Sequence, residues 1–383
     1  MKRLLIGAIA FALGTIPAAA QGLDDLNVQI HGYATQAYIY TNHNNWNTAD
    51  TSDGTAKWTE IVMNLTALPA PKLRIAVQAR YFLLGSYGNN ISLDYGQADY
   101  KINEFFGVRA GKVKTPSGLF NESQDIDPAH VWILLPQSVY PISSRTTLLS
   151  HYGGVVYGTV PVGERFGKFQ YRGFGGEQIV NADDGVLQPE RDNGTTFPSG
   201  LTGKIYGGTL RYEPPVDGLL FGVSIEHERH VGAIVNGART GTFDSGPFDS
   251  VFYYANYQHR SLMLAAEYNR FPPNPTSTFV GFPPNSNPSD AHNWYLMSTW
   301  KFKPKISAGA YYSYSIDLKA PYDQNRYQKD WTLSGRYDVN EFIYLKAEQH
   351  FVNGTGINFS ALDNTGGLST KFNMTLVKLG VMF

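Results

Sequence analysis

Apolar and polar residues alternate with a period of two along most of this chain. Between residues 72 and 84, Leu73, Ile75 and Val77 share one face, whereas Arg74 and Gln78 share the other. Successive side chains of a β-strand point to opposite faces, so this period predicts strands rather than helices. Turn-forming residues divide the pattern into sixteen predicted strands, at 28–41, 56–68, 72–84, 90–102, 105–115, 148–160, 165–177, 202–213, 218–229, 249–258, 260–270, 292–302, 304–317, 328–338, 341–352 and 371–383.

The connections between these strands alternate between two kinds. Seven are tight, such as 69–71, 103–104 and 339–340. Eight are long and polar, at 42–55, 85–89, 116–147, 178–201, 230–248, 271–291, 318–327 and 353–370. Tight turns at one end and long loops at the other are typical of an even-numbered up-and-down barrel. The sequence therefore predicts an all-β fold, a transmembrane antiparallel β-barrel of about 16 strands.

The alternation has the sense expected of a barrel in lipid. In the strand at 218–229, Phe221 and Ile225 lie on one face, and Ser224, Glu226 and Glu228 lie on the other. A soluble barrel packs its apolar face inside, whereas an outer-membrane barrel turns that face toward lipid and lines its lumen with polar residues. A barrel of this many strands encloses an aqueous channel, and it must close because lipid cannot satisfy a free sheet edge.

Composition excludes other classes of protein. The 383 residues are 16% charged and 14% aromatic, contain no cysteine, and have a mean hydropathy of −0.27. A helical membrane bundle needs runs of about 20 apolar residues, which the chain lacks. Aromatic residues fall near predicted strand ends, where they would form interface girdles. They are Trp58, Trp294 and Trp331 at the long-loop ends, and Phe105, Phe166, Phe302 and Phe342 at the tight-turn ends.

Residues 1–20 have the pattern of a secretory signal peptide. Lys2 and Arg3 precede a mainly apolar stretch, which ends in the small residues Ala18, Ala19 and Ala20. We expect cleavage after Ala20, leaving residues 21–383 as the barrel; a buried N-terminal helix is the alternative. The removed segment holds two of the 31 basic residues and none of the 32 acidic residues, so the formal net charge falls from −1 to −3. This balance gives no reason to expect a nucleic-acid partner.

The last predicted strand alternates Val377, Leu379, Val381 and Phe383 on one face, and the chain ends on that phenylalanine. This segment resembles the terminal signature of Gram-negative outer-membrane proteins. The resemblance implies a place in the bacterial cell outer membrane, contact with outer-membrane lipid, and recognition of Phe383 by the barrel-assembly machinery. An ordinary terminal strand that happens to end in phenylalanine is the alternative.

The long loop at 116–147 carries a second resemblance. The stretch G-K-x-K-x-P-x-G-L-F-N-E, at residues 111–122, is similar to one in bacterial porins, including phosphate-selective and related anion-uptake porins. The resemblance implies a third loop that folds into the barrel and narrows it, and a homotrimer. Independently, Leu119-Phe120 and residues 132–135 are too apolar for a solvated loop of this length. A lid over the mouth, or a subunit contact, is the alternative.

An inward loop would place its charges opposite those of the barrel wall. Glu122, Asp125 and Asp127 are the candidate loop residues. The candidate wall residues, on predicted inward faces, are Arg74, Arg80, Arg109, Lys168, Arg172 and Arg211. Opposed charges across a narrow opening filter ions and orient polar solutes. The excess of arginine and lysine favours a weak preference for anions.

The sequence thus predicts a porin for passive diffusion of small hydrophilic solutes and ions. A non-conducting structural or adhesion barrel, with the loop plugging its lumen, is the alternative. His227-Glu228-Arg229-His230 is one residue short of the H-E-x-x-H zinc motif, and on a strand its two histidines would point to opposite faces. We therefore expect no enzymatic activity, no metal and no cofactor.

Overall fold

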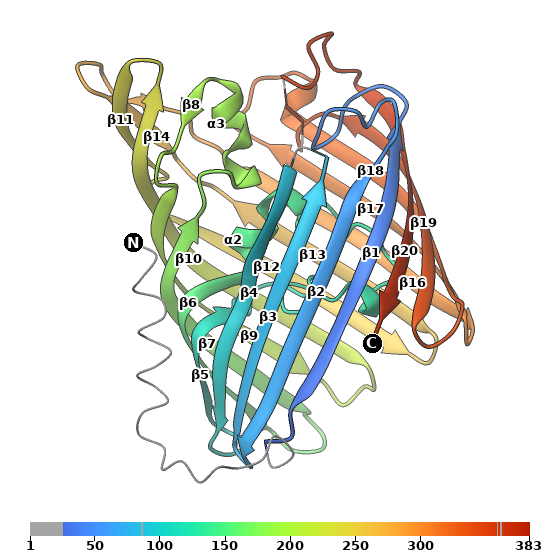
Figure 1. Cartoon of the computed structure of the whole chain (residues 1–383). Coiled ribbons are helices and arrows are strands. Elements are labelled where there is room, and N and C mark those ends of the chain that lie inside the picture. The colour runs from blue at the N-terminus through green and yellow to red at the C-terminus, as the bar shows by residue number, and fades with distance from the viewer. Residues whose placement is uncertain (1–25, 86, 358, 361) are drawn as a thin grey trace.

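The computed structural model describes residues 26–85, 87–357, 359–360 and 362–383, so the expected signal peptide lies outside the described residues. Sixteen long antiparallel strands of the described chain form a closed barrel (Figure 1). They are β1 Gln29–Thr41, β2 Thr55–Ala70, β3 Leu73–Leu84, β4 Tyr87–Lys101, β5 Gly107–Lys114, β6 Ser150–Pro161, β7 Lys168–Val180, β9 Leu201–Glu213, β10 Leu219–Asn236, β12 Phe248–His259, β13 Leu262–Phe271, β16 Ala291–Lys303, β17 Ile306–Asp317, β18 Tyr327–Asp338, β19 Ile343–Gly354 and β20 Lys371–Met382.

The first and last strands close the barrel. β1 pairs with β2 on one side and with β20 on the other, where Tyr33 lies opposite Met382. Beyond β20, the amide nitrogen of Phe383 donates to the Gly32 carbonyl oxygen at 3.0 Å, and the Gly32 amide returns a bond of 3.1 Å to the Phe383 oxygen. The predicted barrel of about 16 strands is confirmed, because each predicted strand overlaps one strand of the closed sheet.

The tight turns lie at one end of the barrel and the long loops at the other. The connection between β3 and β4 is the exception, because it is tight although it lies at the long-loop end. The long-loop end carries four additional short strands, β8 Thr195–Thr196, β11 Arg239–Asp244, β14 Thr276–Phe279 and β15 Asn285–Ser286, and the helix α3 Gln188–Asp192 (Figure 1). The predicted long loop at 85–89 is wrong, because Leu83 and Leu84 pair with Gly88 and Tyr87. Gly85, directly after Leu84, has a φ angle of +59°, which suits the tight connection, and Gly88, at +91°, lies where the register of β3 with β4 shifts. No helix of the described residues is long and apolar enough to cross a membrane.

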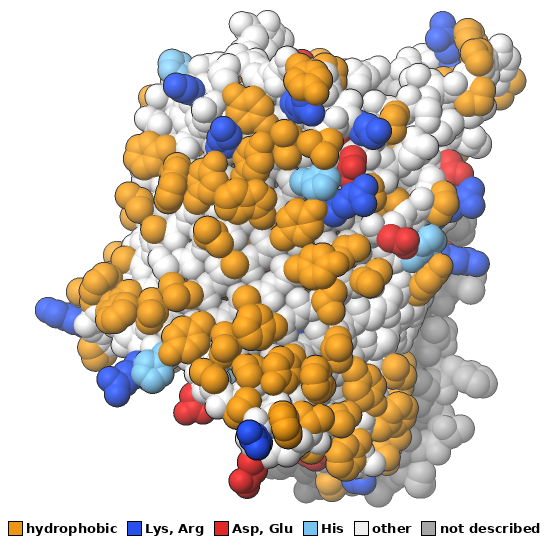
Figure 2. Space-filling view, turned by 180° about the vertical axis from the view of Figure 1, so that it is seen from behind, with side chains coloured by type: hydrophobic (Ala, Val, Ile, Leu, Met, Phe, Trp, Pro, Cys, Tyr) orange, Lys and Arg blue, Asp and Glu red, His pale blue; other side chains and the backbone are white. Residues whose placement is uncertain are grey.

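The outer face of the barrel is apolar. Side chains that point outward from β10 and β20, such as Phe221, Ile225, Val377 and Leu379, are exposed. Hydrophobic side chains cover much of the face shown in Figure 2, and charged side chains are sparse there. A soluble protein rarely exposes so large an apolar surface, whereas an outer-membrane barrel requires it. The outer face of this barrel is therefore suited to contact with membrane lipid.

The predicted aromatic girdles are correct for some positions and wrong for Trp58. Trp331 and Phe302 lie on the outer surface, with 59% and 62% of their areas exposed. Trp58 is only 1% exposed and packs with residues of the barrel interior, including Ile133 and Leu134. Its position near a strand end did not reveal its direction, since one step along a strand reverses the face.

Inward aromatic rings also pack over glycines of neighbouring strands. A Cβ atom at Gly222 would overlap the ring of Tyr254, and one at Gly380 would overlap the ring of Tyr344. Gly222 and Tyr254 are directly opposite each other on β10 and β12, and Gly380 and Tyr344 on β20 and β19. The absent side chains leave room for each ring to lie flat on the wall and to reach the groups described below.

Candidate functional site

The segment 115–149, which we call the third loop, joins β5 to β6 and lies inside the ring of strands (Figure 1). It contains the short helices η1 Asp127–Ala129, η2 Ile142–Ser144 and α2 Arg145–Leu149. Its polar groups bind the wall on many sides. Bonds run from Asp125 to β3, from Ser138 to β17, from Tyr140 to β13 and from Arg145 to β4. The predicted inward-folded loop is confirmed, because these partners come from widely separated strands.

Glu122 of the third loop faces three arginines of the wall, which we call the arginine cluster. Its carboxylate oxygens lie 3.1 Å from Arg109, 3.5 Å from Arg172 and 3.8 Å from Arg211. Arg109 also binds Asp99 of β4 at 2.9 Å. The three arginines thus carry more charge than their two acidic partners, Glu122 and Asp99. All five side chains remain partly exposed. Ionised groups that keep contact with water in a lumen can act on passing ions.

The environment keeps Glu122 ionised. Burial by itself raises the pKa of its carboxyl, but the charges of Arg172, Arg211 and Arg109 outweigh burial and hold the pKa below its usual value. Tyr254, whose ring lies over Gly222, accepts a hydrogen bond of 2.9 Å from Nε of Arg211. The loop carboxylate and a ring from β12 thus fix the direction of this guanidinium.

Asp125 is bound more deeply than Glu122. Its side chain has no exposed area, and its carboxylate lies 2.7 Å from Nζ of Lys114. The Gln78 amide of β3 donates a bond of 2.7 Å to the same carboxylate, and the Tyr33 hydroxyl donates to the Asp125 main-chain oxygen at 3.0 Å. These bonds pair the Asp125 carboxylate with groups of the wall, so this residue holds the loop in place.

Asp127 holds the loop to the other side of the barrel. Its two carboxylate oxygens lie 2.9 Å from Nζ of Lys346 and 2.8 Å from Nζ of Lys378, on β19 and β20, and Tyr344 adds a bond of 2.7 Å. Both lysines are almost fully buried. The sequence pattern did not identify either lysine as a partner of the loop. More than two hundred residues separate them from Asp127, so no local signal could pair them.

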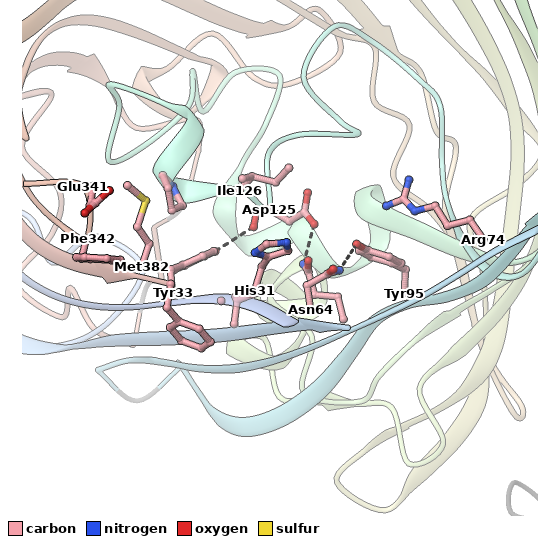
Figure 3. Close-up of a pocket in the computed structure, with 15 residues that line it drawn as sticks. His31, Tyr33, Asn64, Arg74, Tyr95, Asp125, Ile126, Glu341, Phe342 and Met382 are labelled. Carbon is pink, nitrogen blue, oxygen red and sulfur yellow. Dashed lines mark hydrogen bonds between the residues drawn. The ribbon is translucent and has the colours of Figure 1, made fainter. Parts of the chain in front are cut away.

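Three of the predicted wall residues do not pair with the loop carboxylates. Arg80 binds Glu60 of β2 at 2.6 Å, and Lys168 binds Glu213 at 2.9 Å near the tight-turn end. Arg74 lies near the same end of β3, beside a cavity beneath the loop (Figure 3). Ion pairs with a loop carboxylate are therefore seen for Arg109, Arg172 and Arg211, whereas Arg80 and Arg74 only border cavities that loop residues also line. Arg80 and Lys168 each form an ion pair with a glutamate of a neighbouring strand instead of with the loop.

The apolar residues of the third loop pack against the wall as expected. The Trp132 ring meets the Tyr311 ring edge to face, with centroids 5.0 Å apart. The main-chain nitrogens of Ile133 and Leu134 donate to the Glu348 carboxylate at 2.9 and 3.0 Å. Two wall strands, β17 through Tyr311 and β19 through Glu348, thus bind this part of the loop and fix its height in the lumen.

Among the described residues, cavities lie on both sides of the loop and beside it. The turn-side cavity, about 490 Å³, is lined by Arg74, Tyr33 and Asp125 among others (Figure 3). The loop-side cavity, about 500 Å³, opens among the long loops, and the middle cavity is only about 60 Å³. Tyr33 borders both the turn-side and the middle cavity, and Tyr140 borders both the middle and the loop-side cavity. The cavities therefore follow one another through the barrel.

The middle cavity is lined by ionised groups that the sequence analysis did not select. Glu60, Lys378 and Arg145 border it together with Arg80 and Asp127. Arg145 binds Asp94 through both of its terminal nitrogens, each at 2.9 Å. Alternation along the strand is the only sequence signal that could have indicated Glu60 or Lys378. In the described part of the chain, no group of three or more acidic or histidine side chains is arranged to hold a metal ion.

Comparison with known proteins gives structural matches alone. No family model matches the chain, and no curated protein matches it in sequence. OmpT, an outer membrane protein of Vibrio cholerae, superposes with a TM-score of 0.57 at 12% identity, covering 95% of this chain and 99% of that one. OmpF of Salmonella typhi, in complex with daunomycin, gives 0.56 at 12% identity, with the same coverage. An anion-selective porin from Comamonas acidovorans gives 0.55 at 12% identity, covering 93% and 99%. The chain thus has the barrel fold of the Gram-negative outer-membrane porins.

Proposed function

We propose that this protein forms a water-filled channel for passive diffusion of small ions and polar solutes across the outer membrane. The observation that carries the proposal is the set of partly exposed ionised groups, above all the arginine cluster and Glu122, inside a barrel whose lumen is crossed by the third loop. Rings of ionised side chains at a narrowing set the selectivity of a pore. A purely structural barrel gains nothing from a lumen lined in this way.

The middle cavity is the proposed constriction. Its volume of about 60 Å³ leaves room for only a few water molecules. The channel is therefore expected to pass small ions at low conductance and to exclude bulky solutes. The side chains that border this cavity, such as Arg80, Glu60 and Lys378, would contact every permeating ion.

A weak preference for anions belongs to the same proposal. On the turn side of the loop, the arginine cluster outweighs its acidic partners Glu122 and Asp99, and Arg74 adds a further positive charge beside the turn-side cavity. A surplus of one sign on a low-dielectric wall raises the local concentration of the opposite ion. The preference is weak because most lumenal charges are paired.

The test is the zero-current potential of the purified protein in a planar bilayer under a salt gradient. Stepwise conductance with a potential of the anion-selective sign is expected. Arg109→Glu should move the potential toward cation selectivity, whereas Arg165→Glu, the same charge change at an exposed turn, should leave it unaltered. Absence of conductance steps would overturn the channel. A larger cation current in the wild type would overturn only the anion preference.

One observation favours the second candidate, a non-conducting barrel. The third loop is bonded to the wall on many sides, including through Asp125, Asp127 and Glu348. Such a loop could seal the lumen. A variant in which residues 123–143 are replaced by a short glycine-serine linker distinguishes the two: conductance that exists only in this variant identifies a plug.

The proposal also covers processing and assembly. It includes removal of residues 1–20 as a signal peptide, a homotrimer, and recognition of Phe383 by the barrel-assembly machinery. In support, the Phe383 side chain is exposed at the end of the closing strand while its main chain pairs with Gly32. Deletion of Phe383 should lower the amount of assembled protein in the outer membrane, measured against the Phe383→Tyr variant.

A further inference from the structure

The loop-side cavity differs in chemistry from the rest of the lumen. It lies above the third loop, and residues of the two long loops 181–200 and 272–290 border its opening. Its volume of about 500 Å³ is within the range of sites that hold small organic molecules. Neither the proposed constriction nor the arginine cluster contributes a charged side chain to it.

The charged groups of this cavity are acidic. Three glutamates line it, Glu226 and Glu228 on β10 and Glu190 on α3, and its lining contains neither lysine nor arginine. Glu226 is only 4% exposed, and one of its oxygens accepts a bond of 2.9 Å from the Ser117 hydroxyl. A hydroxyl partner leaves the carboxylate charge uncompensated. A buried carboxylate without a counter-ion is costly, so it either takes up a proton or is stabilised by a cation that enters the cavity.

A buried hydroxyl beside these carboxylates lacks a partner. Ser250 lies directly opposite Glu226 in the pairing of β12 with β10 and is 1% exposed. Its Oγ atom, which borders the cavity, makes no hydrogen bond with any described residue. Buried hydroxyls are nearly always bonded, so an unbonded one at a cavity wall marks a position that a ligand or its water would occupy.

The remaining wall is aromatic and aliphatic. Phe248 and Phe271 pack edge to face with centroids 4.9 Å apart, and Phe252 and Phe243 also line the cavity. The faces of aromatic rings attract cations, and burial of a hydrocarbon group against an apolar wall lowers the free energy. Glu228 lies directly opposite Phe248 in the pairing of β10 with β12, so carboxylates and phenyl rings line the same wall. Such a wall is complementary to a molecule that has both a positive group and an apolar body.

We propose that the loop-side cavity is a binding site for a protonated organic amine that carries an aryl or alkyl body. The ammonium group would lie between Glu226, Glu228 and Ser250, and the apolar body would lie against the phenylalanine rings. The site goes beyond the proposed channel and does not depend on conduction. It also accounts for a weak overall selectivity, because the acidic mouth and the arginine cluster oppose each other along one lumen.

The test is calorimetric titration of the full barrel in detergent, with blank titrations into micelles. The probes are 2-phenylethylammonium, ethylammonium and 3-phenylpropanoate. We expect 2-phenylethylammonium to bind at least tenfold more tightly than either of the others. Equal affinity for the three probes, or tighter binding of the carboxylate, would overturn the site.

Variants distinguish binding at this site from general electrostatic attraction of cations to the barrel. Glu228→Gln should weaken binding of 2-phenylethylammonium at least tenfold, and Phe248→Leu should weaken it severalfold. Glu341→Gln is the matched control, because Glu341 borders the turn-side cavity on the other side of the loop. Undiminished binding by Glu228→Gln, or an equal loss in Glu341→Gln, contradicts the proposal. Folding is checked by heat-dependent mobility in gels.

Binding and conduction are measured separately. A barrel that binds the amine but shows no conductance steps overturns the channel and retains the site. A barrel that conducts but binds the three probes equally retains the channel and overturns the site.

Discussion

Glu122 of the third loop accepts a hydrogen bond of 3.1 Å from Nη1 of Arg109 on β5. The same carboxylate is the nearest anion to Arg172 and Arg211. One loop residue thus offsets part of the charge of three guanidinium groups on neighbouring parts of the wall. Both partners are partly exposed to the lumen, so a change at Glu122 should alter ion selectivity more than stability.

Glu122→Gln should increase the preference for anions. Removal of one negative charge near the permeation path changes the ion energy by roughly 1 kcal/mol, or about fivefold in the ratio of chloride to potassium permeability. The zero-current potential in a potassium chloride gradient measures this ratio. Glu104→Gln, in an exposed turn, is the control. An unchanged ratio would place Glu122 outside the permeation path.

Asp127→Asn should destabilise the barrel at neutral pH. The change leaves Lys346 and Lys378 buried close together without their anion, which costs about 3–5 kcal/mol when one partner of a buried ion pair is lost. The measurement is the urea midpoint of unfolding in detergent. Glu341→Gln, at an exposed turn, should leave the midpoint unchanged. A midpoint equal to that of the wild type would show that the two lysines find other partners.

The contribution of Asp127 should also depend on pH. Burial raises the pKa of its carboxyl, but Lys346 and Lys378 outweigh burial and hold the pKa well below its usual range. A carboxyl with a depressed native pKa stabilises the fold above its unfolded pKa of about 4 and loses this contribution as pH falls toward the native value. The wild type should therefore lose stability below about pH 4 more steeply than Asp127→Asn. Parallel pH profiles would contradict this role.

A disulfide between the third loop and the wall should leave conductance unchanged. The hydroxyl oxygens of Ser138 and Ser313 are 2.8 Å apart, and the chain has no cysteine of its own. Ser138→Cys with Ser313→Cys should form a disulfide under oxidation, because the two side chains already touch. The same single-channel conductance before and after reduction is expected of a fixed loop. A rise on reduction would show that the loop moves.

Gly222→Ala should disturb the arginine cluster from a distance. The added methyl group overlaps the Tyr254 ring, whose hydroxyl holds Arg211. Displacement of the ring should cost about 1–3 kcal/mol and release the guanidinium. The zero-current potential and the urea midpoint should both change. Gly335→Ala, where a Cβ would meet open space, should change neither.

The sequence by itself determined the barrel. Alternation of apolar and polar residues is a local property with a period of two, so it predicted the strands, their lipid-facing sides and the inward direction of Glu226 and Arg109. The apolar stretch at 132–135 likewise predicted a loop that packs against the wall. The close pairing of Leu84 with Tyr87 escaped prediction because residues 85–89 resembled a long loop, although the positive φ angle of Gly85 suits a tight connection.

Only the tertiary structure decided which charges meet. The facing of Glu122 and Arg109 could be anticipated, since both belong to the segment around one loop. The partners of Asp127, namely Lys346 and Lys378, come from strands that reach it only when the barrel closes. The register of β10 with β12 likewise placed Ser250 opposite Glu226. Alternation fixes the face on which a side chain lies, but its contact partner depends on strand register and on the path of the loop, which no local pattern records.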